Sequence, residues 1–265
     1  MLKVPVLKVF FLICIVLLIG ACAQAPVFFQ PSSPTGSPTL RPASTTNAGQ
    51  KIEQRTWLVP EDYKNLADAV QVALPGDIVK VSPFSESTGQ VTIDKPLTII
   101  GNKMDYLPIM VRFLITSGKV TLKNLTLYEI TLETKFNTDV PVTIEDCRIG
   151  DINVSSPNIR FVHNTFGGKL LVKPSGAVTL TTSRFPASQD GVETLKLEIS
   201  GSGSIVEKND FWAGIVQVMD NGSNNTLRNN YWAKWDATKP VPVKGSAKSV
   251  DRLPSSTPVT SGWPH

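Results

Sequence analysis

The fold of this chain is decided by the segment VTIEDCRI, residues 142–149, because close variants of it recur along the sequence. In each copy large apolar residues alternate with polar ones, a small polar residue follows, and a further large apolar residue comes shortly after it. The other copies are VTLKNLTL (120–127), IRFVHNTF (159–166), VTLTTSRF (178–185), IVEKNDF (205–211) and NTLRNNY (225–231). Such alternation indicates strands with one buried face.

The small polar residue of each copy marks a period of about twenty residues. The markers are Asn124, Asp146, Asn164, Ser183, Asn209 and Asn229, at steps of 22, 18, 19, 26 and 20 residues. A loose period of this length indicates a solenoid, in which each turn buries its face by stacking on its neighbours. Leucine-rich repeats have a similar length but need a Leu-x-x-Leu-x-Leu frame, which these segments lack. The sequence therefore predicts an all-β protein, a parallel β-helix of about eight coils.

The six markers are expected to fall at the same turn of successive coils. Stacked there, their side chains can bond neighbouring backbone groups, and Asn and Asp tolerate left-handed backbone angles. We therefore interpret Asn124, Asp146, Asn164, Ser183, Asn209 and Asn229 as a structural ladder rather than as a row of functional amides.

A helical segment precedes the repeats. YKNLADAVQVA (63–73) has apolar residues at helical spacing, LPGD (74–77) ends it, and VTIDKPLTIIGN (91–102) follows after a first strand. This succession resembles the entry of right-handed β-helix proteins of the pectin-lyase type, and NNYW (229–232) resembles the N-N-x-W that closes such repeats. Over roughly residues 57–240 the resemblance implies a single-stranded right-handed parallel β-helix with an N-terminal capping helix. The resemblance says almost nothing about which chemistry the protein performs.

The first residues predict export. Lys3 and Lys8 flank the start of a short apolar stretch, whereas a membrane-spanning helix needs about 20 apolar residues. LIGAC (18–22) resembles the lipobox of bacterial lipoproteins. This implies that residues 1–21 are a signal peptide and that Cys22 is diacylated and becomes the first mature residue. An ordinary secretory signal, cut near residue 21 or 23, is the alternative.

Two acyl chains would anchor the protein firmly, at about 0.8 kcal/mol for each buried CH₂ group. The expected location is the outer face of the cell membrane, or the outer membrane in a two-membrane cell, because Ala23 rather than Asp follows the cysteine. Residues 22–56 are rich in Pro, Ser and Thr and predict an extended tether, with an ordered strand around 27–29 as the alternative. The β-helix is expected over 57–240, and an irregular C-terminal tail over 241–265.

The composition limits the classes of partner that the chain is expected to bind. The chain has 26 basic and 22 acidic residues, and removing Lys3 and Lys8 with the signal leaves a net charge near +2. No run of Lys or Arg forms a nucleic-acid footprint, so nucleic acid is not the expected partner. Cys14 is lost with the signal and Cys22 carries lipid, which leaves Cys147 without an internal disulfide partner. We expect it to be a buried structural thiol.

The sequence shows no recognisable catalytic set. The G-x-x-D-F-I-F-G segment of pectin methylesterases, the W-x-D-H of pectate lyases and the paired aspartates of polygalacturonases do not occur, and residues 137–139 match only Asn-Thr-Asp. His163 is the one histidine besides the terminal residue, so a His-based metal site or a Ser/His/Asp triad is not expected. No cofactor is predicted.

One acidic cluster is a weaker candidate for a cation. Glu145, Asp146 and Asp151 lie close in the chain, and residues one coil apart stack at about 4.8 Å, so their carboxylates could bind Ca²⁺ through oxygen ligands. Solvated side chains are the alternative.

Aromatic residues gather near the end of the repeats. Phe211 and Tyr231 follow the apolar register and are assigned to the core. Trp212 and Trp235 fall outside it and are candidate contacts for sugar rings, with packing in the core or a cap as the alternative.

These observations predict a cell-envelope lipoprotein that displays a non-catalytic binding or scaffold module. Its partners would be the membrane, through the lipid, and a polysaccharide or other envelope component; glycan is implied by the fold-level resemblance alone. One alternative is a polysaccharide-active enzyme (lyase, hydrolase or esterase), which requires charged residues to converge in one outward groove. A purely structural envelope protein is the other.

Overall fold

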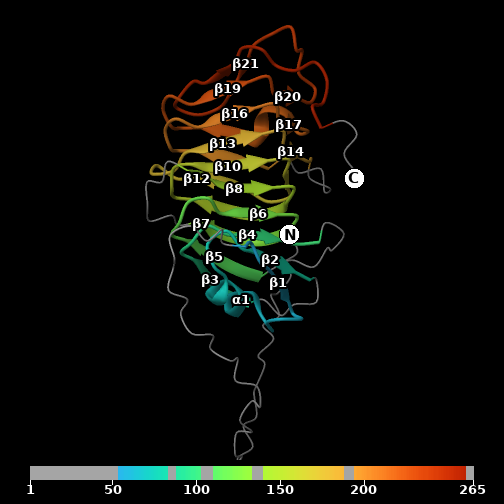
Figure 1. Ribbon diagram of the computed structural model, residues 1–265. Helices are drawn as coiled ribbons and strands as arrows, with labels where there is room; N and C mark the ends of the chain where they lie inside the picture. Colours follow the sequence, from blue (N-terminus) through green and yellow to red (C-terminus); the bar gives the residue numbers. More distant parts are fainter. Residues whose placement is uncertain (1–52, 83–87, 103–109, 133–139, 188–193, 261–265) are drawn as a thin grey trace, which may run out of the picture. The chain divides into compact units, whose positions relative to one another are not determined.

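The computed structural model describes residues 53–82, 88–102, 110–132, 140–187 and 194–260. Over these residues the chain is an all-β parallel solenoid of about seven turns with a short helix near its N-terminal end (Figure 1). The predicted fold class is confirmed, with about seven turns in place of about eight, and the winding is consistent with the right-handed prediction. Cys22, the signal and most of the tether lie outside the described residues. No helix in the described part is long and apolar enough to cross a membrane.

The first sheet contains nine parallel strands within the described residues, paired in chain order. They are β1 (Thr56–Val59), β2 (Ile78–Val81), β4 (Thr98–Ile100), β6 (Thr121–Lys123), β8 (Val142–Glu145), β10 (Ile159–Val162), β13 (Val178–Thr181), β16 (Ile205–Glu207) and β19 (Thr226–Arg228). The middle residue of each repeat points inward and is buried, as at Leu122, Ile144 and Leu180. The alternation read from the sequence is thus the alternation between core and surface.

The second sheet divides at one strand. Its members are β7 (Thr126–Leu132), β9 (Arg148–Val154), β11 (Thr165–Phe166), β12 (Leu170–Val172), β14 (Arg184–Phe185), β15 (Leu197–Ile199), β17 (Asp210–Phe211), β18 (Val218–Asp220) and β20 (Tyr231–Trp232). The start of β9 pairs with β11 and its end pairs with β12. One arm therefore continues as β11–β14–β17–β20 and the other as β12–β15–β18.

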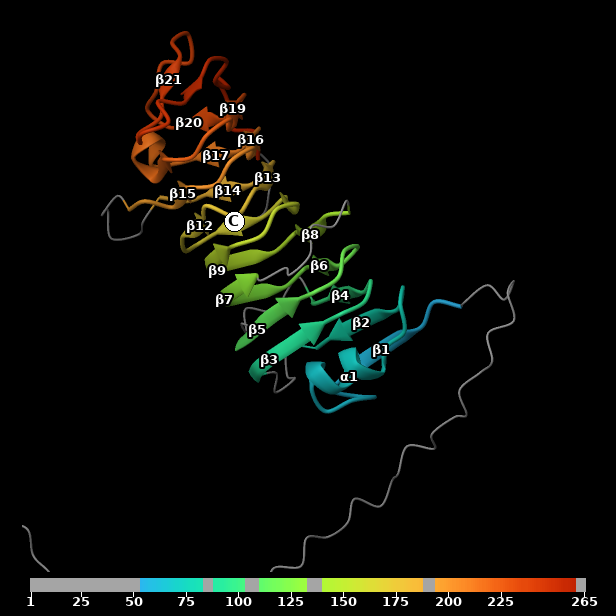
Figure 2. The ribbon, with the colours of Figure 1, turned by 90° about the vertical axis from the view of Figure 1, so that its left-hand side faces the viewer.

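The remaining elements lie mainly toward the ends of the stack. The helix α1 (Leu66–Val72) lies at the N-terminal end, where β3 (Thr88–Ile93) pairs in parallel with β5 (Met110–Ile115). A 3₁₀ turn, η1 (Gly214–Gln217), precedes β18, and β21 (Val241–Pro242) pairs antiparallel with β22 (Val250–Asp251). Figure 2 shows α1 at one end of the coils and β21 at the other.

A column of stacked aromatic rings fills the core behind the β11–β14–β17–β20 arm. The ring centroids of Phe166 and Phe185 lie 4.7 Å apart, those of Phe185 and Phe211 4.8 Å, and those of Phe211 and Trp232 4.5 Å. Each ring is buried. Stacked aromatic pairs contribute about 0.5–1.5 kcal/mol beyond their buried area. The prediction that Phe211 is a core residue is confirmed. The prediction for Tyr231 is wrong, because Trp232 continues the stack while Tyr231 is half-buried and pairs with Asp210.

Each coil turns from the first sheet into the second sheet through a residue with positive φ followed by an inward residue. The positive φ angles lie between 46° and 57° at Asn124, Asp146, His163, Thr182, Lys208 and Asn229. The inward residues that follow are Leu125, Cys147, Asn164, Ser183, Asn209 and Asn230, all buried. The six predicted ladder residues therefore occupy two adjacent positions: Asn164, Ser183 and Asn209 point inward, whereas Asn124, Asp146 and Asn229 hold the left-handed angle.

The inward residues form a continuous hydrogen-bonded ladder. The backbone N–H of each donates to a side-chain oxygen one coil later: Cys147 to Asn164 Oδ1 (2.9 Å), Asn164 to Ser183 Oγ (3.1 Å), Ser183 to Asn209 Oδ1 (2.9 Å) and Asn209 to Asn230 Oδ1 (3.0 Å). The Asn amides donate in turn to carbonyls at the first sheet, as from Asn164 Nδ2 to Ile144 O (2.8 Å) and from Asn209 Nδ2 to Leu180 O (2.9 Å). Buried backbone donors at the turns are thereby satisfied.

The N-terminal end is closed by α1 and by the buried Asp77. Asn65 caps α1 by accepting from the Asp68 N–H, and Leu66, Ala69 and Val70 of the helix are buried against the core. Buried Asp77 accepts from the backbone of Arg55 and Leu74 and from Trp57 Nε1, each at 2.9 Å. These hydrogen bonds hold the pKa of Asp77 below its usual value, against the effect of its burial.

The C-terminal segment, expected as an irregular tail over 241–265, packs against the last coils in its described part. Its described part, residues 241–260, contributes β21 and β22, and Val241 and Val243 are buried. Asp251 extends the ladder by one coil, because its Oδ2 accepts from the Asn230 N–H at 3.0 Å and from Trp232 Nε1 at 3.1 Å.

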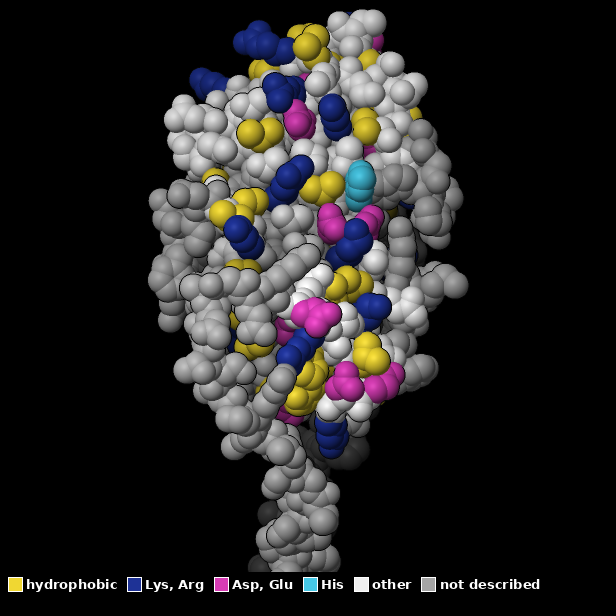
Figure 3. Space-filling model, viewed as in Figure 1, with side chains coloured by type: hydrophobic (Ala, Val, Ile, Leu, Met, Phe, Trp, Pro, Cys, Tyr) yellow, Lys and Arg dark blue, Asp and Glu magenta, His cyan; other side chains and the backbone are white. Residues whose placement is uncertain are grey.

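The outer face of the first sheet carries both signs of charge. Lys123 contacts Glu145 at 2.7 Å and Arg228 contacts Glu207 at 2.7 Å, in each case between paired strands. Figure 3 shows Lys, Arg, Asp and Glu side chains interspersed over this face. Exposed pairs of this kind contribute about 0–1 kcal/mol each, so the core and the ladder carry the stability.

Two neighbouring asparagines provide a test of the ladder. Asn230→Ala removes the acceptor of the buried Asn209 N–H and the donor to Val206 O (3.0 Å), and we expect a loss of about 2–4 kcal/mol in the free energy of unfolding in urea. Asn229→Gly keeps a residue that accepts a φ of 57°, so its change should stay within about 1 kcal/mol. Equal losses in the two variants would contradict the ladder as described.

Candidate functional site

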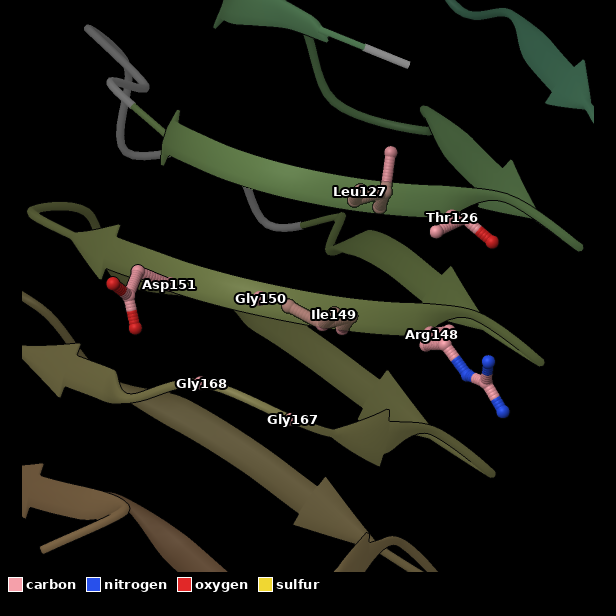
Figure 4. Close-up of a pocket in the computed structure, with 8 residues that line it drawn as sticks. All are labelled: Thr126, Leu127, Arg148, Ile149, Gly150, Asp151, Gly167 and Gly168. Carbon is pink, nitrogen blue, oxygen red and sulfur yellow. The ribbon is translucent and has the colours of Figure 1, made fainter. Parts of the chain in front are cut away.

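A groove of about 370 Å³ lies where the second sheet divides. Its lining comes from three successive coils: Thr126, Leu127, Arg148, Ile149, Gly150, Asp151, Gly167 and Gly168 (Figure 4). Ligand pockets in proteins typically measure about 300–1,000 Å³, so the groove is at the lower end of that range.

The groove forms at a β-bulge. Ile149 pairs with Phe166 and Ile152 pairs with Leu170, so residues 150–151 on β9 lie opposite residues 167–169 on the next coil. The extra residue bends the chain and separates β11 from β12, as bulges do. The Ile149 carbonyl accepts from both Gly167 N (2.7 Å) and Gly168 N (3.4 Å) across this bulge.

Asp151 completes the hydrogen bonding of the bulge. Its Oδ1 accepts from the Lys169 N–H at 2.7 Å. A Cβ at Gly168 would lie 2.4 Å from that oxygen and 2.4 Å from the carbonyl carbon of Gly150. An added Cβ would thus collide with the neighbouring coil, so glycine is required at position 168.

The two charged residues of the groove lie at opposite ends of its floor. Arg148 and Asp151 are exposed and are three residues apart on β9, a separation of roughly 10 Å along a strand. Figure 4 places Ile149, Gly150, Gly167 and Gly168 between them. The Ile149 side chain is buried in the core, so the outer floor between the charges is mainly backbone. A guanidinium donates to acceptor oxygens and a carboxylate accepts from hydroxyl or ammonium groups, so the two ends offer opposite hydrogen-bonding chemistry.

Two lysines brace the rim of the groove. Lys196 Nζ donates to the Gly167 carbonyl at 2.6 Å, and Lys169 Nζ contacts Glu198 Oε2 at 2.5 Å. Both lysines come from coils that follow β9, so the bulge is tied to the β12–β15 arm. This bracing favours a preformed groove.

The predicted acidic cluster is split between two places. Glu145 and Asp146 lie beside Lys123, at 2.7 and 3.5 Å from its Nζ, and this hydrogen bond to Glu145 raises the pKa of Lys123. Asp151 belongs to the groove instead. In the described part of the chain no group of three or more His, Cys, Asp and Glu side chains is placed to hold a metal ion.

The two predicted tryptophan contacts lie away from the groove lining. Trp212 is half-buried, with the Arg184 guanidinium 5.4 Å from its ring centroid and the Tyr231 ring at 5.6 Å in an edge contact. Trp235 packs against the core and donates from Nε1 to the Lys239 carbonyl at 3.1 Å. Both rings are thus engaged in packing at the C-terminal end.

Cys147 is the buried thiol that the sequence predicted. Its Sγ lies 3.2 Å from the Glu145 carbonyl, and burial raises its pKa to about 12. The group is therefore a protonated thiol at neutral pH and lacks the thiolate needed for nucleophilic chemistry. His163 is exposed at the left-handed turn position.

No family model, curated protein or solved structure matches this chain. The groove and its residues are consequently known from the geometry alone. Apart from Asp151, the sequence reasoning did not single out its lining; the one signal was the pair Gly167–Gly168 directly after a strand, since glycine inside a strand pattern indicates a bulge.

The two glycines of the bulge make a matched test. Gly168→Ala forces a Cβ against backbone and Asp151, and we expect a loss of about 1–3 kcal/mol in the free energy of unfolding. Gly167→Ala places its Cβ 3.7 Å from the nearest atom, so its effect should be within about 0.5 kcal/mol. Urea titrations of both variants check this, and a Gly168→Ala protein as stable as Gly167→Ala would rule out the bulge geometry.

Proposed function

We propose that this protein is a cell-envelope lipoprotein whose β-helix, of the pectin-lyase-like type, is a non-catalytic module that contacts polysaccharide through the groove at β9. The observation that carries the proposal is a glycine floor between Arg148 and Asp151 on the outside of a rigid solenoid. Glycines let a flat ring approach the backbone, while Arg148 can donate to ring or acidic oxygens and Asp151 can accept from sugar hydroxyls.

Binding is the function that this geometry supports best. General acid–base cleavage of a glycosidic bond commonly uses two carboxylates on either side of the bond. Among the described lining residues Asp151 is the carboxylate, and its Oδ1 already accepts from the bulge backbone. The parallel coils on either side of the groove extend the surface along which a polymer can lie.

Groove substitutions test this directly. We expect Arg148→Ala to weaken retention of the purified protein on its preferred polysaccharide by about tenfold or more, because a hydrogen bond to a charged group contributes about 1.5–3 kcal/mol. Asp151→Asn keeps an acceptor for Lys169 N–H and should weaken retention while the protein stays folded. Arg160→Ala, an exposed arginine on the first sheet, is the matched control and should bind as the unchanged protein does.

The purified protein is incubated with a panel of polysaccharides that includes peptidoglycan. Two quantities are measured: retention of the protein on each polymer and release of sugars from it. Release of shorter or unsaturated products that disappears on substitution of a single outward carboxylate would replace the binding proposal with an enzyme. Retention that is unaffected by Arg148→Ala and Asp151→Asn would remove the groove from the proposal.

The lipid anchor is tested separately. Cys22→Ser removes the thiol on which the acyl chain is built, so we expect palmitate incorporation to be lost and the protein to leave the membrane fraction. Undiminished label together with unchanged fractionation would contradict the lipoprotein proposal.

A further inference from the structure

We infer that residues 241–260 are an intramolecular cap over a self-association surface at the C-terminal end of the solenoid, and that the partner this surface fits is the same end of a second copy of this chain. The inference uses none of the groove residues. It stands on the way in which the last strand edges are occupied.

The cap segment covers the last strand of the first sheet and of each arm of the second. At β18 the Asp220 N–H donates to the Lys244 carbonyl at 2.8 Å. Next to β19, the Asn229 N–H donates to Asp251 Oδ1 at 3.2 Å. At β20 the Ser255 N–H donates to the Asn230 carbonyl at 2.8 Å, and Tyr231 and Ser255 form a parallel bridge. The segment thus acts as one further coil without long strands of its own.

Buried carboxylates hold the cap in place. Asp220 Oδ2 accepts from Ser249 Oγ at 2.5 Å, and Asp210 accepts from the backbone of Val259 (2.7 Å) and Thr260 (3.0 Å). Both aspartates are fully buried beneath the segment, and Asp251 within the segment is fully buried as well. An apolar layer lies beside them, since Trp232 is 2% exposed and packs in the same core cluster as Val241 and Val243.

Removing the cap would therefore expose strand edges and apolar core together. Unpaired edges present rows of N–H and C=O groups that readily pair with another chain, and the exposed core adds a hydrophobic drive. No strand of the same chain remains beyond β22 in the described residues to replace the cap.

The two ends of the solenoid differ, and this difference determines which ends of two copies can face each other. At the N-terminal end α1 covers the core, and the outer edge of β1 is occupied by its own turn: the Leu58 N–H donates to Asp62 Oδ2 at 2.8 Å, and the Leu58 carbonyl accepts from Asp62 N at 2.8 Å. Because α1 covers the core and the Leu58 backbone groups already have partners, this end is less suited to head-to-tail stacking. Two uncapped C-terminal ends can face each other about a two-fold axis, which closes the assembly at a dimer.

The experiment compares two truncations in a Cys22→Ser background, so that lipid does not cause association. One chain stops after Pro240 and lacks the whole cap; the control stops after Thr260 and keeps it. Light scattering should give twice the monomer mass for the first and the monomer mass for the second. A synthetic peptide of residues 241–260, added in excess, should return the first chain to monomer.

A shortened chain that keeps the strand signal in circular dichroism and stays monomeric overturns the inference. Growth beyond a dimer, or association that the peptide leaves unchanged, overturns it as well. If the shortened chain does not fold, a protease site inserted at the exposed residues Thr238–Lys239 of the full chain lets the protein fold first and lose its cap afterwards. The same three readouts then apply, and a stripped protein that remains a folded monomer is again decisive against the inference.

Discussion

The structure depends on one recurring hydrogen bond, from the backbone N–H of an inward turn residue to the side chain of the inward residue one coil later. At each corner the chain leaves one strand and enters the next, so this N–H points into the core where no strand carbonyl can reach it. Asn164, Ser183, Asn209 and Asn230 supply the missing acceptors at 2.9–3.1 Å. A buried donor left without a partner costs about 1–3 kcal/mol, so the ladder is a condition for stacking coils rather than an addition to it.

The same constraint explains where aspartate appears. Asp62 accepts from the edge of β1, Asp77 from the entry turn and Asp151 from the bulge. Asp210 accepts from the cap, and Asp251, which is part of the cap, accepts from the last coil. In each place the parallel ladder is interrupted and a backbone N–H lacks a neighbouring strand. A carboxylate accepts several such bonds at once and needs no partner strand. These five aspartates therefore act where sheets end or bend.

The repeat made the solenoid predictable because the buried residues alternate strictly with polar ones. The alignment of the coils was less predictable, because the left-handed position and the inward position both accept asparagine: at Asn229–Asn230 the sequence offers both, and choosing the first moved Tyr231 into the core in place of Trp232. The cap was hidden because Asp251, which completes the ladder, lies in a Pro- and Ser-rich segment without alternation. The groove could not be predicted from the sequence, because its floor is mainly backbone and leaves no pattern of side chains in the sequence.

The groove follows from unequal coil lengths. Ladder partners are separated by as few as 17 residues, between Cys147 and Asn164, and by as many as 26, between Ser183 and Asn209. The first sheet and the inward corner keep their register, so added residues fall elsewhere. One lies between Phe166 and Leu170, opposite Gly150 and Asp151, and another lies in the turn between Val172 and Val178. The core thus determines where the surface can open, while Arg148 and Asp151 lie on the exposed side of β9. On β9 the inward residues Ile149 and Ile152 therefore belong to the core, and the outward residues Arg148 and Asp151 belong to the groove.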